Sequence, residues 1–331
     1  MSVAGASGTV LEANVPYHSE ALKAYLLATK PQGCNTHTAR AMAMVAYQRA
    51  QLLAPGKNVY GLGATAALAT HRDRRGQDRC HVAIQSADKT IVHETLLDKN
   101  LSRLEQESIC NELIVAAIAQ ALGINDTIVM SQPIKLDSRI QPAEASWEEL
   151  LAGTITGAIK STATKDYDGI FPGAFNPMHE GHREMLDYYR RTQPGAIALE
   201  ISIHNVDKSP LDFMTMAERA LAITDIDLVF TNAPTFRDKA QLFPGATFIV
   251  GLDTIVRIDD PKYYDNESAR DAAIQSMANQ GNHFLVFGRL MDGDFVSLGS
   301  TKLTPSLREM CIEVPESEFR QDTRSSELRA R

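Results

Sequence analysis

The second half of the chain contains the string GIFPGAFNPMHEGH, which runs from Gly169 to His182 and limits the folds that the chain can adopt. It has the pattern of a short apolar strand, a turn rich in glycine and proline, and the first turn of a helix. Ligands of open α/β sheets bind at such strand-to-helix junctions. The string therefore predicts a parallel sheet and the place on it where a ligand binds.

Two histidines in the string, His179 and His182, are spaced three residues apart. If the helix begins just before them, their imidazoles share one face at its positive end. Backbone N–H groups at a helix start favour anions, and imidazoles add directed donors for charge on phosphate oxygens. Gly173 and Gly181 would leave room beside a ligand, while Pro177 enforces the turn. A triphosphate is the expected ligand.

After residue 165 the pattern alternates between strand and helix. The expected strands cover 168–171, 196–203, 228–230, 247–250 and 283–287, and the expected helices cover 181–191, 215–223 and 269–279. Alternation of this kind predicts an α/β fold with a parallel sheet.

The first half predicts an α/β domain of its own. Helices are expected over 36–53 and 102–122, the latter with Ser102 as N-cap and Gly123 just past its end. Strands are expected over 9–16, 57–63 and 80–86, and a proline-containing stretch at 131–146 precedes a helix over 147–160. The 331 residues suit about two domains. We place them at 1–135 and 166–331, joined by a linker and helix at 136–165.

The composition limits the classes of partner that the protein is expected to bind. With 33 basic and 41 acidic residues the net charge is −8, which argues against nucleic acid. No stretch approaches the roughly 18 apolar residues of a membrane span, and the chain start lacks a signal-peptide pattern. We expect a cytoplasmic protein with small-molecule nucleotides as partners, no nucleic acid and no membrane, and homo-oligomerisation stays open. The four cysteines have no paired spacing and are expected to be structural, and no protein metal ligands are predicted.

GAFNPMHEGH resembles the GxFxPxHxGH signature of the HIGH-type nucleotidyltransferase superfamily, which includes the nicotinamide mononucleotide adenylyltransferases. An isolated HxGH would be weak, since two histidines near a turn can be ordinary surface residues. The longer string is more specific. The resemblance implies a C-terminal Rossmann-like nucleotidyltransferase domain with His179 and His182 catalytic. It also implies nucleotide binding by the residues around them, namely Pro172, Gly173, Ala174, Phe175, Asn176 and Gly181.

Three further segments extend the resemblance. HNVDK ends at Lys208, which would be a catalytic lysine on the phosphate side. FIVGLD implies that Gly251 and Asp253 meet the adenosine, with Asp253 near the sugar. TRSSELR resembles the family's SSTxxR motif, so the resemblance assigns the β- and γ-phosphates to three residues, Ser325, Ser326 and Arg329. The chain departs from the pattern there, with RSSE in place of SSTE. A rival match at 300–302 lacks the arginine.

The reaction that the resemblance implies is in-line attack of a mononucleotide phosphate on the α-phosphate of ATP, with Mg²⁺ bridging the phosphates. The protein would contribute positioning and charge stabilisation. His179 and His182 would hold the phosphates, and Lys208 and Arg329 would neutralise the departing pyrophosphate. No covalent intermediate is required.

The first half resembles a diverged, partial CinA C-terminal domain, the nicotinamide-nucleotide amidase family, through segments at 5–17, 38–43 and 61–67. Leu22 occupies the position of the family's lysine. Lys23 follows it, but one residue turns a helical side chain by about 100 degrees. GLGATA replaces the family's TGxAGP loop and suggests a glycine-rich turn without the proline. We expect no amidase activity and a packing or oligomerisation role.

The leading function is transfer of the adenylyl group of ATP to nicotinamide or nicotinate mononucleotide, a step of NAD biosynthesis. The acceptor is inferred by association, because both families include members that act on nicotinamide mononucleotide. One alternative keeps the superfamily and changes the substrates, for example CTP with a phosphorylated alcohol or ATP with phosphopantetheine. Another is a non-catalytic nucleotide-binding sensor or scaffold.

Overall fold

A computed structural model describes residues 4–71, 75–124, 130–159, 166–204, 210–291 and 294–320. The chain divides into two compact units. The first comprises 1–152 together with 204–217, and the second comprises 153–203 together with 218–331. Residues 210–217, from the second half of the chain, therefore pack with the first unit.

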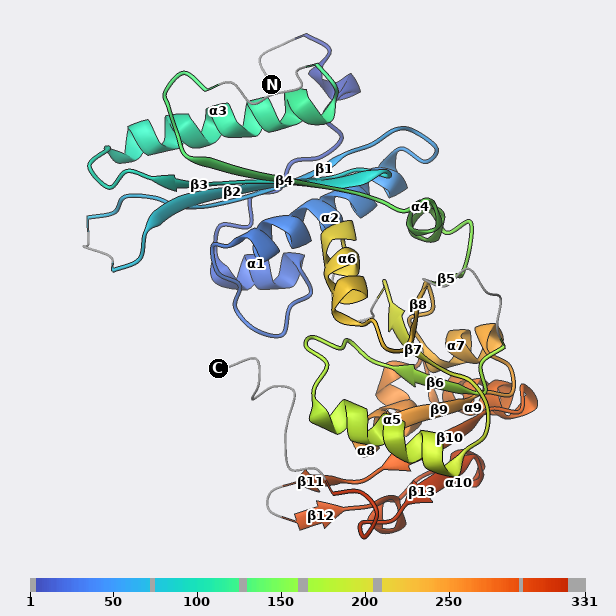
Figure 1. The fold of residues 1–331 in the computed structure, drawn as a ribbon. Coiled ribbons are helices and arrows are strands. Elements are labelled where there is room, and N and C mark those ends of the chain that lie inside the picture. Colours follow the sequence, from blue (N-terminus) through green and yellow to red (C-terminus); the bar gives the residue numbers. More distant parts are fainter. Residues whose placement is uncertain are drawn as a thin grey trace. The chain divides into compact units, whose positions relative to one another are not determined.

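The first unit is a four-stranded antiparallel sheet in the order β1-β2-β3-β4. The strands are β1 (Gly61–Ala67), β2 (Asp78–Gln85), β3 (Lys89–Leu97) and β4 (Leu136–Pro142). Helix α2 (Thr36–Leu53) covers one face and α3 (Arg103–Ala121) covers the other (Figure 1). The shorter helices are η1 (Ala6–Gly8), α1 (Ser19–Tyr25) and α4 (Ala145–Ala152).

The faces of this sheet follow the two-residue period of a strand. Val82 and Ile84 of β2 are buried with Leu113 of α3. Ala83, which lies between them, is buried with Ala43 of α2. Successive side chains of a strand point to opposite faces, so one buried strand supports a helix on each side.

The two long helices predicted for the first half are confirmed. α2 begins at Thr36 and ends at Leu53, as the sequence predicts. α3 begins after Ser102, whose hydroxyl accepts from the Glu105 N–H while the Glu105 carboxylate accepts from the Ser102 N–H. Gly123 follows its end with φ +69°. Both helices were predictable from local signals, α2 from its apolar run and α3 from its apolar spacing and its two caps.

Three predictions for the first half are wrong. Residues 9–16 form no strand, the first strand begins at Gly61 rather than 57, and GLGATA is strand β1 rather than a turn. The glycines serve packing. A Cβ on Gly61 would lie 2.1 Å from the Ala43 carbonyl oxygen, and one on Gly63 would lie 2.1 Å from that of Ala39. The strand can therefore approach the α2 backbone directly.

We expect Gly61→Ala to lower the free energy of unfolding by about 1–3 kcal/mol or more, because the methyl group meets backbone that cannot rotate away. Urea denaturation measures the change. Gly76→Ala is the matched control in the same unit, since its Cβ would lie 3.9 Å from the nearest atom, a nitrogen of Arg79. Equal stability of the two variants would contradict the packing argument.

Two further segments of the first half differ from expectation. The stretch at 131–146 contains β4, an edge strand with mostly exposed side chains and therefore no hydrophobic alternation to reveal it. The helix expected over 147–160 ends at Ala152 and is followed by β5 (Gly157–Ile159).

The second unit holds a seven-stranded sheet in the order β13-β10-β9-β6-β7-β8-β5. Its strands are β6 (Gly169–Pro172), β7 (Ile197–Ser202), β8 (Asp227–Thr231), β9 (Thr247–Gly251), β10 (His283–Phe287), β13 (Cys311–Val314) and the edge strand β5. All but β5 run parallel. Numbered along the chain, the parallel strands lie in the order 3-2-1-4-5-6, with the switch between β6 and β9.

The helices of the second half are α5 (Glu180–Thr192), α6 (Phe213–Ala222), α7 (Phe236–Leu242), α8 (Leu252–Asp259), α9 (Glu267–Asn279) and α10 (Pro305–Glu309). Shorter pieces are η2 (Pro261–Tyr263), η3 (Leu298–Ser300) and the hairpin of β11 (Arg289–Met291) and β12 (Asp294–Val296). The predicted alternation of strands and helices and the parallel α/β sheet are confirmed, with ends shifted by a few residues. The expectation missed the shorter helices and β13.

Helices flank both faces of this sheet (Figure 1). Ile170 of β6 belongs to an apolar cluster with Ile255 of α8 and Ile274 of α9. Its neighbour Gly169 faces the other way, where a Cβ would lie 2.4 Å from the Tyr189 ring of α5. Because Gly169 has no side chain, α5 can pack directly against β6.

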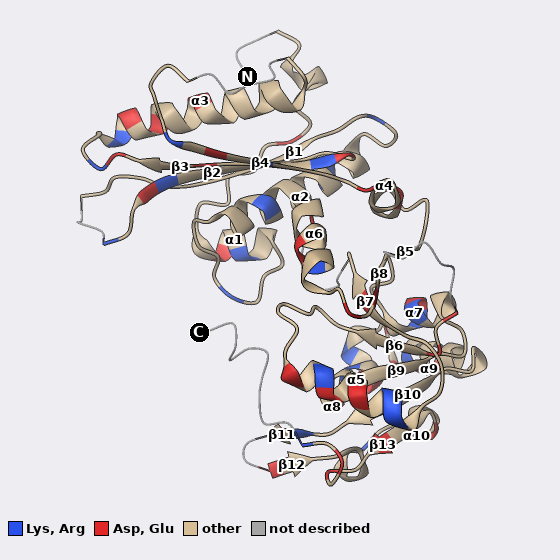
Figure 2. Ribbon diagram, viewed as in Figure 1, with Lys and Arg blue, Asp and Glu red and all other residues tan. Residues whose placement is uncertain are grey.

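Charge is mixed over the described chain. Figure 2 shows acidic and basic residues interspersed along the helices, including α5, which begins with Glu180 and has Arg190 and Arg191 in its last turn. Acidic residues near a helix start and basic residues near its end favour the helix dipole. Among the described residues, no helix is long and apolar enough to cross a membrane.

Candidate active site at the carboxyl edge of the parallel sheet

The loop that joins β6 to α5 is folded around one buried aromatic side chain. Phe175 is 2% exposed and has a left-handed backbone conformation with φ +42°. Its ring packs edge-on against Phe171 and His182, with centroids 5.3 and 5.1 Å away. A Cβ on Gly173 would lie 2.7 Å from that ring. Gly173 therefore makes room for Phe175, a packing reason that the sequence interpretation did not foresee.

The structure brings His179 and His182 together. His179 is the N-cap of α5 and His182 lies in its first turn, so the helix begins slightly later than the spacing argument assumed. The two rings stack with centroids 3.7 Å apart and an interplanar angle of 26°. Both imidazoles thus lie at the positive end of one helix.

The tautomer of His182 follows from a backbone hydrogen bond. The His179 N–H donates to His182 Nδ1 over 3.2 Å. A nitrogen that accepts carries no proton, so the neutral ring bears its proton on Nε2. Burial, with a smaller contribution from His179, lowers the pKa of His182 to about 4. At neutral pH His182 is therefore an uncharged donor through Nε2–H.

The low pKa of His182 predicts a pH dependence of stability. Its pKa falls from an ordinary 6.5 to about 4 on folding, so between these values the unfolded chain binds more protons. Stability from this group is fully present above pH 6.5 and is lost as the pH falls towards 4. We expect the urea midpoint of His182→Asn to decline less steeply over pH 6.5–4 than that of the unsubstituted protein. Parallel curves would contradict the burial of a neutral imidazole.

A second helix start lies beside the first. β9 pairs with β6 in parallel, so their carboxyl ends share one edge of the sheet, and α8 begins directly after β9 with Gly251 as its N-cap. Asp253 lies in the first turn of α8. The starts of α5 and α8 thus follow the two strands at the switch in strand order, where open α/β sheets bind ligands.

Asp253 has a partner that the sequence interpretation missed. Arg289 forms an ion pair with its carboxylate and directly follows Gly288 at the carboxyl end of β10. Because β10 neighbours β9, Arg289 and Asp253 share one edge of the sheet. The position of Arg289 just after a predicted strand was the signal in the sequence that could have marked it as a site residue. The pairing of β10 with β9, which brings Arg289 to Asp253, joins distant segments and was not predictable from that signal.

Of the other predicted site residues, four lie within the described residues and four do not. Pro172 ends β6, Ala174 and Asn176 are exposed in the loop, and Gly181 is buried in the first turn of α5. Four more lie outside the described residues, namely Lys208, Ser325, Ser326 and Arg329.

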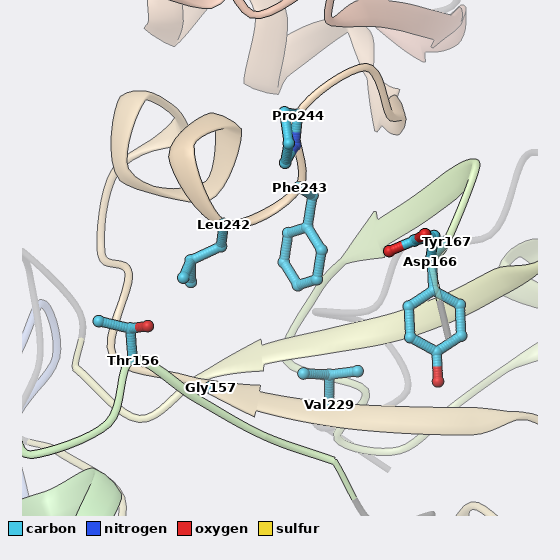
Figure 3. Close-up of a pocket in the computed structure, with 8 residues that line it drawn as sticks. All are labelled: Thr156, Gly157, Asp166, Tyr167, Val229, Leu242, Phe243 and Pro244. Atoms are coloured by element: carbon cyan, nitrogen blue, oxygen red, sulfur yellow. The ribbon is translucent and has the colours of Figure 1, made fainter. Parts of the chain in front are cut away.

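A cavity of about 580 Å³ lies elsewhere in the second unit, beside the end of α7 and the strand that carries Val229 (Figure 3). Its lining contains none of the predicted site residues and comprises Thr156, Gly157, Asp166, Tyr167, Val229, Leu242, Phe243 and Pro244. Tyr167 donates to Asp227 over 3.3 Å, and burial raises its pKa to about 12. The cavity is therefore distinct from the histidine pair.

Within the described residues, no group of three or more His, Cys, Asp and Glu side chains is placed to hold a metal ion. A Mg²⁺ ion commonly keeps several waters and binds through substrate phosphates. Protein ligands are thus not required for Mg²⁺ that arrives with a nucleotide.

The chain matches no family model, no curated protein and no solved structure.

Proposed function

We propose that this chain is a nucleotidyltransferase, similar to the HIGH-type superfamily, that transfers the adenylyl group of ATP to nicotinamide or nicotinate mononucleotide and releases pyrophosphate. One observation carries the proposal. Two stacked histidines occupy the start of α5, directly after the strand at which the strand order of a parallel sheet switches. Such a position suits a phosphate-bearing ligand.

The chemistry proposed for these residues is stabilisation of negative charge. His182 offers Nε2–H as a neutral donor, which needs no change in protonation as charge develops on the phosphate oxygens. The positive end of α5 adds a fixed partial charge. Attack by the mononucleotide phosphate forms the new P–O bond as the bond to pyrophosphate breaks, and the protein supplies position and charge stabilisation. Mg²⁺ would enter with ATP.

The choice of acceptor rests on a different argument. The resemblance of the first half to nicotinamide-nucleotide amidases makes pyridine mononucleotides the most economical acceptors, an inference by association. The first unit itself is expected to lack amidase activity, because Leu22 replaces the lysine of that family and Lys23 forms an ion pair with Glu20.

The test is pyrophosphate release by purified protein with Mg²⁺, ATP or CTP, and a panel of phosphorylated acceptors. Release with ATP and a pyridine mononucleotide is the expected result. Release only with CTP or only with another acceptor would keep the reaction class and overturn the substrate. Binding of ATP without turnover on any acceptor would overturn the enzymatic proposal and favour a nucleotide sensor, and nucleotide-dependent thermal stabilisation detects that binding.

A further inference from the structure

The ion pair of Arg289 with Asp253 lies at the same edge of the parallel sheet as the histidine pair. We propose that Arg289 is a positioning residue for nucleotide binding, which orients the Asp253 carboxylate and offsets its negative charge at an edge that receives phosphates. The inference rests on the proposed function and adds a residue to the same site.

The start of α8 fixes the position of Asp253. Strand β9 ends at Gly251, and α8 follows it directly. Leu252 and Ile255, on either side of Asp253 in the first turn, are buried in the apolar cluster of the second unit. The Asp253 side chain is 48% exposed. The buried neighbours thus hold the helix start against the sheet, while Asp253 stays accessible to a ligand.

A hairpin fixes the position of Arg289. Strand β11 follows β10 after Gly288, and its first residue, Arg289, pairs in register with Val296 of β12. A Cβ on Gly288 would lie 2.5 Å from the Phe295 ring, so the hairpin packs closely against the end of β10. Val296 also packs on the apolar cluster that contains Ile255. Backbone anchored in one core therefore carries both partners of the ion pair.

The ion pair leaves part of the Asp253 carboxylate for a ligand. Arg289 Nη1 pairs with Oδ2 of the carboxylate. An ionised carboxylate has two acceptor oxygens with several lone pairs. A contact that holds Oδ2 limits rotation of the carboxylate, so that Oδ1 can accept from ligand hydroxyls such as those of a ribose.

The charge of Arg289 decides the sign of the local charge at the start of α8. A helix start carries a partial charge of roughly +0.5, which attracts phosphates. The Asp253 carboxylate alone would change the local charge to about −0.5, and the Arg289 guanidinium returns it to about +0.5. A nucleotide brings several negative charges to this edge, and an unpaired carboxylate would repel it.

The strand order places Arg289 within reach of a nucleotide at the histidine pair. Strands β10, β9 and β6 are consecutive in the sheet, and β6 leads to His179 and His182. Neighbouring strands lie about 4.8 Å apart, so the end of β10 is roughly 10 Å from that of β6. A nucleotide whose phosphates lie at the start of α5 can therefore extend along the edge to Asp253.

The experiment compares four full-length variants, namely Arg289→Met, Asp253→Asn, the double variant and the control Arg257→Met. Asparagine keeps the Oδ1 acceptor and removes the charge of the carboxylate. Arg257 is an exposed residue in the last turn of α8, with its guanidinium over the Tyr263 ring. The control therefore removes the same charge at the other end of the same helix. The measurements are Mg²⁺–ATP affinity by calorimetry at low and high salt, and kcat and KM for ATP.

We expect Arg289→Met to weaken ATP binding on the order of tenfold at low salt and by less at high salt, since salt screens exposed charges. KM for ATP should rise in step while kcat stays unchanged. Arg257→Met should match the unsubstituted protein. The double variant should recover most of the lost affinity, because no unpaired carboxylate remains in it.

Unaltered affinity in Arg289→Met would overturn the inference while the proposed function stands. An equal loss from Arg289→Met with and without Asp253→Asn would also overturn it, because Arg289 would then act independently of Asp253. A merely structural role would lower the active fraction and hence kcat with KM unchanged, and that result would overturn it too. If the unsubstituted protein binds no nucleotide, the proposed function fails and this inference fails with it.

Discussion

Pyrophosphate release by the His182→Ala variant is expected to fall by a factor on the order of 100 to 1,000, the usual cost of removing one donor to developing charge. Alanine removes the Nε2–H donor and leaves the His179 ring without its stacking partner. The loss should appear in kcat more than in KM, because the donor acts chiefly on charge that develops during the reaction. Steady-state kinetics with saturating ATP and acceptor measure it.

His283→Ala is the matched control for this prediction. His283 begins β10 in the same unit, is exposed, and lies at the amino end of its strand, opposite the edge that carries the candidate site. We expect its activity to equal that of the unsubstituted protein. A folded His182→Ala variant with full activity would remove this histidine from the mechanism.

Substitution of Lys239 by methionine is expected to lower the free energy of unfolding by about 3–5 kcal/mol, because it leaves the buried Glu200 carboxylate without its charged partner. Lys239 Nζ of α7 donates to Glu200 Oε1 of β7 over 2.8 Å and to the Ala233 carbonyl over 2.7 Å. The two charged side chains are 7% and 1% exposed, and the Thr231 hydroxyl also donates to Glu200. Urea denaturation followed by circular dichroism measures the change.

The double variant Glu200→Met with Lys239→Met separates loss of the pair from loss of packing. It should recover most of the stability, since apolar residues of similar volume often replace a buried ion pair without cost. Arg190→Ala is the control, because its pair with Asp187 lies at the surface and surface pairs contribute about 0–1 kcal/mol. Equal losses in Lys239→Met and Arg190→Ala would contradict the prediction.

The Glu200–Lys239 ion pair is linked to the candidate site through the backbone of Glu200. Glu200 lies opposite Pro172 in the sheet, and its carbonyl accepts from the Gly173 N–H over 3.0 Å. The backbone of the same residue therefore anchors the first residue of the loop that carries Phe175. Lys239→Met is expected to disturb that loop, and the double variant to restore it.

Elements with local signals were predictable from the amino-acid sequence. The bounds of α2, the N-cap of α3 at Ser102 and the strand-to-helix junction at β6 all follow from composition, spacing, caps and turn residues within a few positions of one another. The spacing of His179 and His182 likewise predicted that the two rings would lie together. Strand β4 escaped prediction because an exposed edge strand has no hydrophobic alternation.

Features that depend on residues far apart in the chain required the folded structure. The neutral state of His182 needs burial around its ring, where Phe171 and Phe175 lie against it. The packing of Asp212 within the first unit involves Arg40, which lies 172 positions away in the chain. Composition and periodicity report on neighbours in sequence, whereas a pKa or a buried ion pair depends on which residues folding brings into contact.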